Sequence, residues 1–132
     1  MGEIRDTAII DALRRQMSIA AAKQAIAAGN LANVNTPGYK ARAVDFAQAL
    51  ERELGGSVSL AATQANHLSD ASSEQAPAAV EVDGLPARRD GNTVQIDREL
   101  LTMTSAAGEF ARAQTALAAK FRLVKYAINE GR

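Results

Sequence analysis

Apolar residues recur at alternating intervals of three and four along the first part of the chain. This spacing places them on one face of an α-helix and is typical of helices that pair in coiled coils. It predicts an N-terminal assembly helix over residues 1–35. The positions run over three and a half heptads and are Ile10, Leu13, Met17, Ala20, Gln24, Ala27, Leu31 and Val34.

The last part of the chain has the same spacing, which predicts a C-terminal assembly helix over residues 97–132. Asp97 is placed to cap its start, with Ile96 and Leu101 as a hydrophobic staple. The positions are Leu100, Met103, Ala107, Phe110, Gln114, Leu117, Phe121, Val124 and Ile128.

We define the assembly seam as the larger apolar members of both sets. Each set also contains one glutamine, Gln24 or Gln114, which either fixes the helix register across an interface or turns to the edge of the seam. The seam residues are Ile10, Leu13, Met17, Leu31, Leu100, Met103, Phe110, Leu117, Phe121, Val124 and Ile128.

A turn and a short helix are expected over residues 36–54. Asp45 can cap this helix with Gln48 three residues later, and Gly55-Gly56 can end it. Phe46 and Leu50 would share one face of it with Leu54.

Residues 55–96 collect glycine, proline and serine, and this composition predicts a loop-rich insertion. Strands are indicated only at Val80–Val82 and Thr93–Ile96, which Asp90-Gly91 could join as a hairpin. The predicted fold is therefore mainly α: two long terminal helices paired as a coiled coil, a short third helix and an irregular middle with little β-structure. Together they form one discontinuous domain.

The length of the two helices predicts a rod rather than a compact globule. Several apolar residues, such as Ile4 and Leu123, lie outside the two heptad sets, and a helix pair alone would leave them in water. The pattern therefore favours folding that is completed by association. A self-contained three-helix bundle, with residues 45–54 covering the remaining apolar stripe, is the alternative.

Composition narrows the function classes. Lys plus Arg and Asp plus Glu are balanced at 15 each, which disfavours a polyanion partner. The chain has no cysteine and one histidine, which excludes thiolate nucleophiles and zinc-thiolate sites and leaves a metal site dependent on carboxylates. No phosphate-binding loop or nucleophile motif appears. We expect no enzyme activity, cofactor or metal, and neither a membrane-spanning segment nor a cleaved secretory signal.

A distinctive string, Asn30-Leu-Ala-Asn-Val-Asn-Thr-Pro-Gly-Tyr-Lys-Ala-Arg42, follows the first heptad set. Pro37 presets φ and Gly38 can adopt the positive φ of a type II turn, so the helix must stop near Val34 and the chain must turn. Asn33 can bond free backbone groups at the helix end, as can Asn35. A well-formed helix stop alone accounts for these residues.

The string closely resembles the signature of the bacterial flagellar rod and hook axial protein family. Lys40-Ala-Arg42 leading to Asp45-Phe46, Asp90-Gly-Asn-Thr-Val94 and Asp97-Arg-Glu99 are similar to the proximal rod group of this family, the FlgB type. The resemblance covers roughly residues 8–54 and 90–130. The matching signature positions are Asn30, Ala32, Asn33, Thr36, Pro37, Gly38 and Tyr39.

The resemblance implies a structural subunit of the proximal rod of the flagellar basal body, in the periplasm, exported from the cytoplasm by the flagellar type III apparatus. It implies as partners further copies of the chain, rod proteins of the FlgC and FlgF types, the basal-body adaptor FliE and export-gate proteins. Phe46 and Leu50 resemble the short motif by which early substrates engage the export gate, although the same spacing marks one helical face.

Two other functions remain open at this point. A soluble helical adaptor or chaperone would also expose heptad faces, and another rod protein of the same family would share the signature. An enzyme has no motif in its favour.

Overall fold

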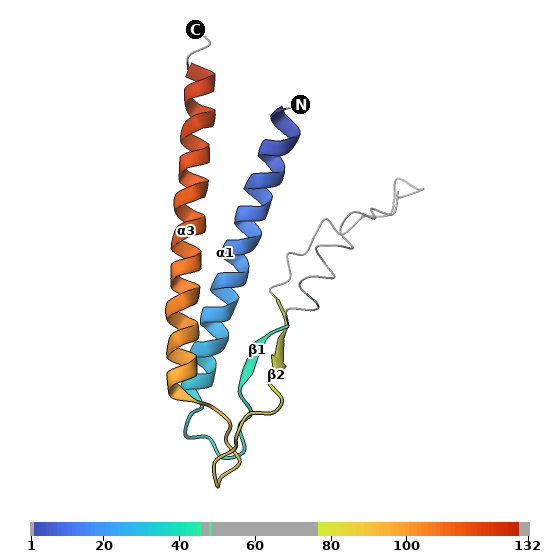
Figure 1. The fold of residues 1–132 in the computed structure, drawn as a ribbon, viewed down its shortest axis with the longest axis vertical. Coiled ribbons are helices and arrows are strands. Elements are labelled where there is room, and N and C mark those ends of the chain that lie inside the picture. The colour runs from blue at the N-terminus through green and yellow to red at the C-terminus, as the bar shows by residue number, and fades with distance from the viewer. Residues whose placement is uncertain (1, 46–47, 49–76, 130–132) are drawn as a thin grey trace, which may run out of the picture.

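The computed structural model describes residues 2–45, 48 and 77–129. Two long helices dominate it, α1 (Gly2–Ala32) and α3 (Ile96–Asn129). They pack side by side in antiparallel directions, so both chain ends lie at the same end of an elongated molecule (Figure 1). At 1.5 Å per residue, their 31 and 34 residues give lengths of about 47 and 51 Å. The predicted mainly helical fold with two long packed helices is confirmed.

The interface between the two helices is lined by alanine. Ala20 and Ala27 on α1, and Ala106 and Ala113 on α3, are the buried apolar residues of the helix pair. All eight heptad positions on the N-terminal side, from Ile10 to Val34, are buried or half-buried. Because alanine has a small side chain, this interface brings the helix backbones close but removes little apolar area from water.

The C-terminal heptad set divides between two environments. Met103, Phe110, Leu117 and Val124 are half-buried on the side of α3 that faces α1, where Glu99 and the buried alanines also lie. Leu100 is 51% exposed. It follows the buried Glu99 by one residue, which in a helix of 3.6 residues per turn is a rotation of about 100°.

Phe121 and Ile128 also remain outside the interface, for a different reason. Their exposed fractions are 54% and 71%, and on α1 the side chain of Ile9 is 47% exposed. Figure 1 shows that the two helices diverge toward the chain ends. Ile9 belongs to the N-terminal part of α1, and Phe121 and Ile128 belong to the C-terminal part of α3. The seam predicted along the whole of α3 is therefore only partly covered by α1.

A two-stranded antiparallel sheet lies beside the helix pair. Strand β1 (Arg42–Val44) pairs with β2 (Ala79–Glu81), with Ala43 opposite Val80. The predicted strand near Val80 is thus present, but the prediction that Thr93–Ile96 forms its partner strand is wrong. Residues 92–94 are buried against the end of α1 and bond there with side-chain groups, so they are not available to form a ladder.

Helix α3 begins before the residue that the sequence predicts as its cap. The Glu99 amide donates to the Gln95 carbonyl at 3.0 Å, so Asp97 lies within the first turn instead of capping it. Ile96 and Leu101 are both exposed and do not form the buried staple that the sequence predicts.

The short helix predicted within residues 36–54 lies outside the described residues except for Asp45 and Gln48. The Gln48 amide donates to Asp45 Oδ1 at 3.0 Å.

Enlarging an interface alanine should destabilise the helix pair. Ala113→Met places a longer side chain where the native residue is 2% exposed, and we expect the free energy of unfolding to fall by about 1–3 kcal/mol from overpacking. The exposed Ala116 on the same helix gives the control, Ala116→Met, with a change within about 0.5 kcal/mol. Urea unfolding followed by circular dichroism measures both. Equal effects would show that Ala113 does not lie at a packed interface.

Candidate assembly surface and polar hub

The signature string forms the end of α1 and the turn that follows it. The Asn33 side-chain amide donates to the Gly29 carbonyl at 2.8 Å, and this carbonyl also accepts from the Asn33 backbone amide at 3.2 Å. The Tyr39 amide donates to the Thr36 carbonyl at 3.3 Å, and Gly38 has φ of 73°. These are the features of the type II turn that Pro37 and Gly38 predict.

Asn30 is fully buried and bonds to three separate segments. Its Nδ2 donates to the Arg42 carbonyl at 2.8 Å and to Glu99 Oε2 at 3.0 Å. Its Oδ1 accepts from the Arg42 amide at 3.0 Å and from Tyr39 Oη at 3.4 Å. One side chain thereby joins the end of α1 to the start of β1 and to the first turn of α3.

Asn92 is the second fully buried asparagine. Its Nδ2 donates to the carbonyls of Asn33 at 2.9 Å, Val34 at 3.2 Å and Thr36 at 2.9 Å. Its Oδ1 accepts from the Val94 amide at 2.8 Å. Asn92 therefore acts as a side-chain cap for the end of α1, supplied from a loop 56 to 59 residues away in sequence.

Backbone bonds reinforce this junction. The Gly38 amide donates to the Asp90 carbonyl at 2.8 Å, and the Thr93 amide donates to the Tyr39 carbonyl at 3.0 Å. The Ala41 amide donates to Thr93 Oγ1 at 2.8 Å. We call the four buried polar residues of the described chain the polar hub: Asn30, Asn92, Thr93 and Glu99.

Sequence reasoning identified only one member of the hub, Asn30, as a site residue. The other three belong to the strings Asp90–Val94 and Asp97–Glu99, whose family resemblance is the only signal for them in the sequence. Ala32, Thr36 and Pro37 of the signature are exposed, and Tyr39 is half-buried.

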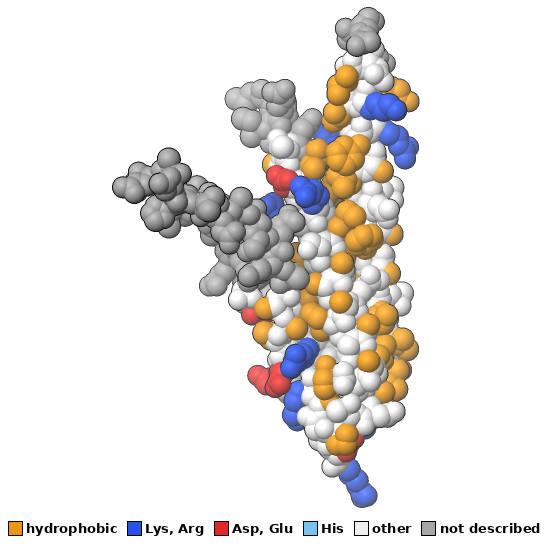
Figure 2. All heavy atoms as spheres, turned by 180° about the vertical axis from the view of Figure 1, so that it is seen from behind, with side chains coloured by type: hydrophobic (Ala, Val, Ile, Leu, Met, Phe, Trp, Pro, Cys, Tyr) orange, Lys and Arg blue, Asp and Glu red, His pale blue; other side chains and the backbone are white. Residues whose placement is uncertain are grey.

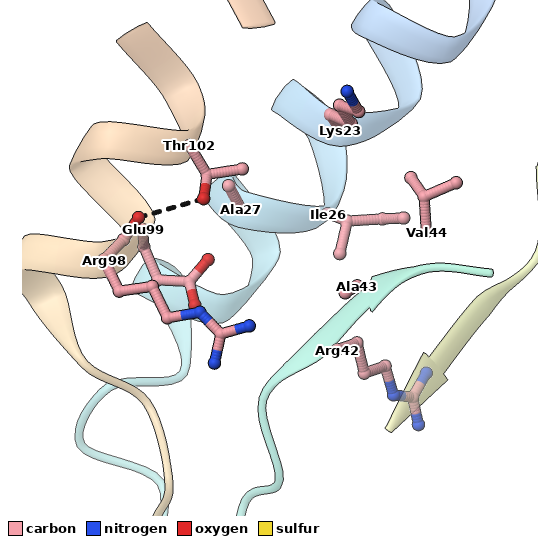
Figure 3. A pocket seen from close by; sticks show the side chains of 9 residues that line it. All are labelled: Lys23, Ile26, Ala27, Arg42, Ala43, Val44, Arg98, Glu99 and Thr102. Carbon is pink, nitrogen blue, oxygen red and sulfur yellow. Dashed lines mark hydrogen bonds between the residues drawn. The ribbon is translucent and has the colours of Figure 1, made fainter. Parts of the chain in front are cut away.

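A groove of about 160 Å³ opens beside the hub, between α1, β1 and the first turns of α3 (Figure 3). Ile26 and Val44 give it apolar walls, while Arg42 and Arg98 bring positive charge. Lys23, also at the groove, forms an ion pair with Glu109 at 3.0 Å. Among the described residues, no group of three or more His, Cys, Asp or Glu side chains could hold a metal ion.

The exposed apolar residues form the candidate assembly surface, and most of them are on α3. Leu101, Leu123 and Tyr126 lie on the side of α3 turned away from α1, and Leu100 lies on its flank. Figure 2 shows apolar side chains along much of the length of the elongated body. An α-helix that carries apolar residues on several faces is typically buried on several faces. The large exposed apolar residues of the described chain are Ile9, Val80, Ile96, Leu100, Leu101, Phe121, Leu123, Tyr126 and Ile128.

Two further predictions concern other parts of the chain. Phe46 and Leu50, the residues that resemble an export motif, lie outside the described residues. Within the part of the chain that the structure describes, neither long helix is sufficiently apolar to cross a bilayer.

Comparison with known proteins gives matches that all point to one family. The profile of the family described as flagella basal body rod protein matches residues 10–40. The flagellar basal body rod protein FlgB of Salmonella typhimurium is 40% identical over 91 residues, covering 63% of this chain and 65% of the relative. FlgB of Yersinia enterocolitica is 37% identical over 91 residues, covering 63% and 66%. These two matches span just under two thirds of the relatives' length. FlgB of Escherichia coli is 30% identical over 123 residues, covering 87% of this chain and 88% of the relative.

Two glycines near the end of α1 should respond in opposite directions to the same substitution. Gly38 has positive φ, so Gly38→Ala should lower the free energy of unfolding by about 1–2 kcal/mol. Gly29 is helical with open space at its Cβ, so Gly29→Ala should raise it by about 0.5–1 kcal/mol. Thermal and urea unfolding of the two variants test the pair. Stabilisation by Gly38→Ala would contradict the turn described here.

Proposed function

Because this chain belongs to the family of flagellar basal body rod proteins, of the FlgB type, we propose that it is a structural subunit of the proximal rod that assembles by packing of its two long helices. The family is a structural one and not a family of enzymes. The observation that carries the proposal is the distribution of apolar side chains on α3. After α1 has packed against one face, large apolar residues still lie on the flank and on the opposite face.

The helix pair supports this proposal by its small core. The fully buried apolar residues of α1 and α3 are alanines, whereas several large apolar side chains on α3 are exposed: Leu100, Leu101, Phe121, Leu123 and Tyr126. Burying a large apolar side chain stabilises a structure by about 1.5–3 kcal/mol relative to leaving it in water. Neighbouring subunits would therefore supply apolar burial that the single chain lacks. An adaptor or chaperone would also expose heptad faces, but it would be expected to form a stable, compact monomer or small oligomer.

The proposed partners follow from the rod assignment. They are further copies of the chain, rod proteins of the FlgC and FlgF types, the adaptor FliE during assembly and export-gate proteins during export. We place the assembled subunit in the periplasmic part of the basal body, after export through the flagellar type III apparatus. The coiled-coil supercoiling of the terminal helices is part of the same proposal.

Phe121 provides the test of assembly. Because its side chain is already 54% exposed, Phe121→Asp should leave the helical content of the purified chain unchanged while preventing rod assembly and swimming motility. Phe121→Leu keeps an apolar contact and should support both. Circular dichroism, basal-body isolation and soft-agar motility in a strain that lacks the wild-type gene measure these outcomes. Normal motility with Phe121→Asp would contradict the proposed surface.

The export proposal has a separate test. Phe46→Ser should reduce the amount of chain that leaves the cytoplasm, whereas the neighbouring change Ala47→Ser should not. The helical content of both purified variants serves as the control for folding. Equal export of the two variants would show that Phe46 has no role in engaging the export gate.

A further inference from the structure

The polar hub joins two stretches of chain that are far apart in sequence. Asn30 bonds to Glu99, which lies 69 positions later in the sequence, and the Asn92 side chain reaches back to the turn after α1. From this arrangement we infer that the polar hub is a two-part latch, in which Asn30 and Asn92 are positioning residues that fix the sheet and α3 relative to α1. The inference concerns the free chain and does not depend on the rod assignment.

The first half of the latch is Asn92 on the end of α1. Buried carbonyls in the turn that follows a helix need hydrogen-bond partners. Here the carbonyls of Asn33, Val34 and Thr36 converge on one buried amide group. Water has no access to replace that group, because Asn92 is fully buried. The turn over residues 33–39 is therefore completed only when the loop around Asn92 has docked.

The second half is Asn30 on β1 and α3. It donates to the Arg42 carbonyl and accepts from the Arg42 amide, as a neighbouring strand would. This two-bond contact fixes where β1 leaves the end of α1. The same Nδ2 also donates to Glu99, which sets the position of the first turn of α3. Apolar contacts alone are less directional and would allow sliding between these elements.

The two halves depend on each other through the segments that they share. Thr93 follows Asn92 and bonds through Oγ1 to the Ala41 amide, next to the main chain that Asn30 holds. Because a buried polar group without a partner is costly, loss of one half exposes the groups of the other. A change at Asn92 should thus alter hydrogen exchange at residues 38–42, which lie 50 to 54 positions earlier in the sequence.

Hydrogen exchange on the full chain tests this coupling. Asn92→Asp keeps the side-chain size but presents oxygen atoms to three carbonyl oxygens. We expect the amides of Gly38, Ala41 and Arg42 to exchange at least about tenfold faster, the equivalent of one buried group left unsatisfied. Amides in the middle of α1 and α3 should change less than about twofold, because the alanine interface is untouched. The control Asn35→Asp alters an exposed asparagine in the same turn and should change none of these rates.

Two results would overturn the latch. One is faster exchange confined to residues 88–94, which would give Asn92 only a local role. The other is an equal rise in exchange over the whole chain, which would make the hub a general contributor to stability. If Asn92→Asp does not fold, Thr93→Val is the deciding variant. It replaces the hydroxyl that accepts from the Ala41 amide by a methyl group of similar size, and it should accelerate exchange at Ala41 and Arg42 while sparing the middle of the helices. Unchanged rates at Ala41 and Arg42 in that variant would equally refute the inference.

Discussion

Two asparagine side chains that are completely removed from water set the constraint on which this fold depends. A primary amide has two donor hydrogens and an oxygen acceptor, and burying it is tolerated only when these groups find partners. Asn30 and Asn92 find theirs mostly on the backbone, at the end of α1, at the start of β1 and in the turn between them. The shape of the junction is therefore specified by hydrogen-bond geometry more than by apolar packing. The helices, which carry most of the residues, extend from it.

The parts of the fold that sequence reasoning predicts are those whose cause is local. Pro37 and Gly38 determine their turn by their own backbone preferences, and the spacing from Ile10 to Val34 identifies the inward face of α1. The C-terminal spacing predicts a helix equally well. It does not determine how that helix is rotated about its axis, because this depends on the partner that it meets. For this reason Leu100, which the spacing places in the seam, is exposed, whereas the neighbouring Glu99 is buried.

The parts that sequence reasoning missed are those whose cause is distant. Strand β1 has only three residues, too few for a period to be visible, and its partner β2 is more than 30 positions later. Asn92 occurs in a string that predicts a turn, and the turn is present, since the Gly91 amide donates to the Arg88 carbonyl at 2.9 Å. Nothing local indicates that its side chain reaches the carbonyls that end α1. A buried polar residue of this kind is visible in a single sequence only through family resemblance.

The hub lies at one end of the molecule, whereas part of the assembly surface lies toward the two chain ends, and this arrangement has a physical consequence. At the hub, satisfied buried polar groups and the sheet hold the chain in one arrangement. Toward the two chain ends the helices diverge, and apolar groups such as Ile9, Phe121 and Ile128 face water (Figure 1). A subunit that ended in a tightly closed helix pair would gain little from a neighbour there. The divergence leaves apolar area for neighbours to cover, while the hub fixes the direction from which the helices present it. Where a neighbour covers this area with a different surface of its own, the contact is heterologous, and heterologous contacts that do not close into a ring build open helical assemblies.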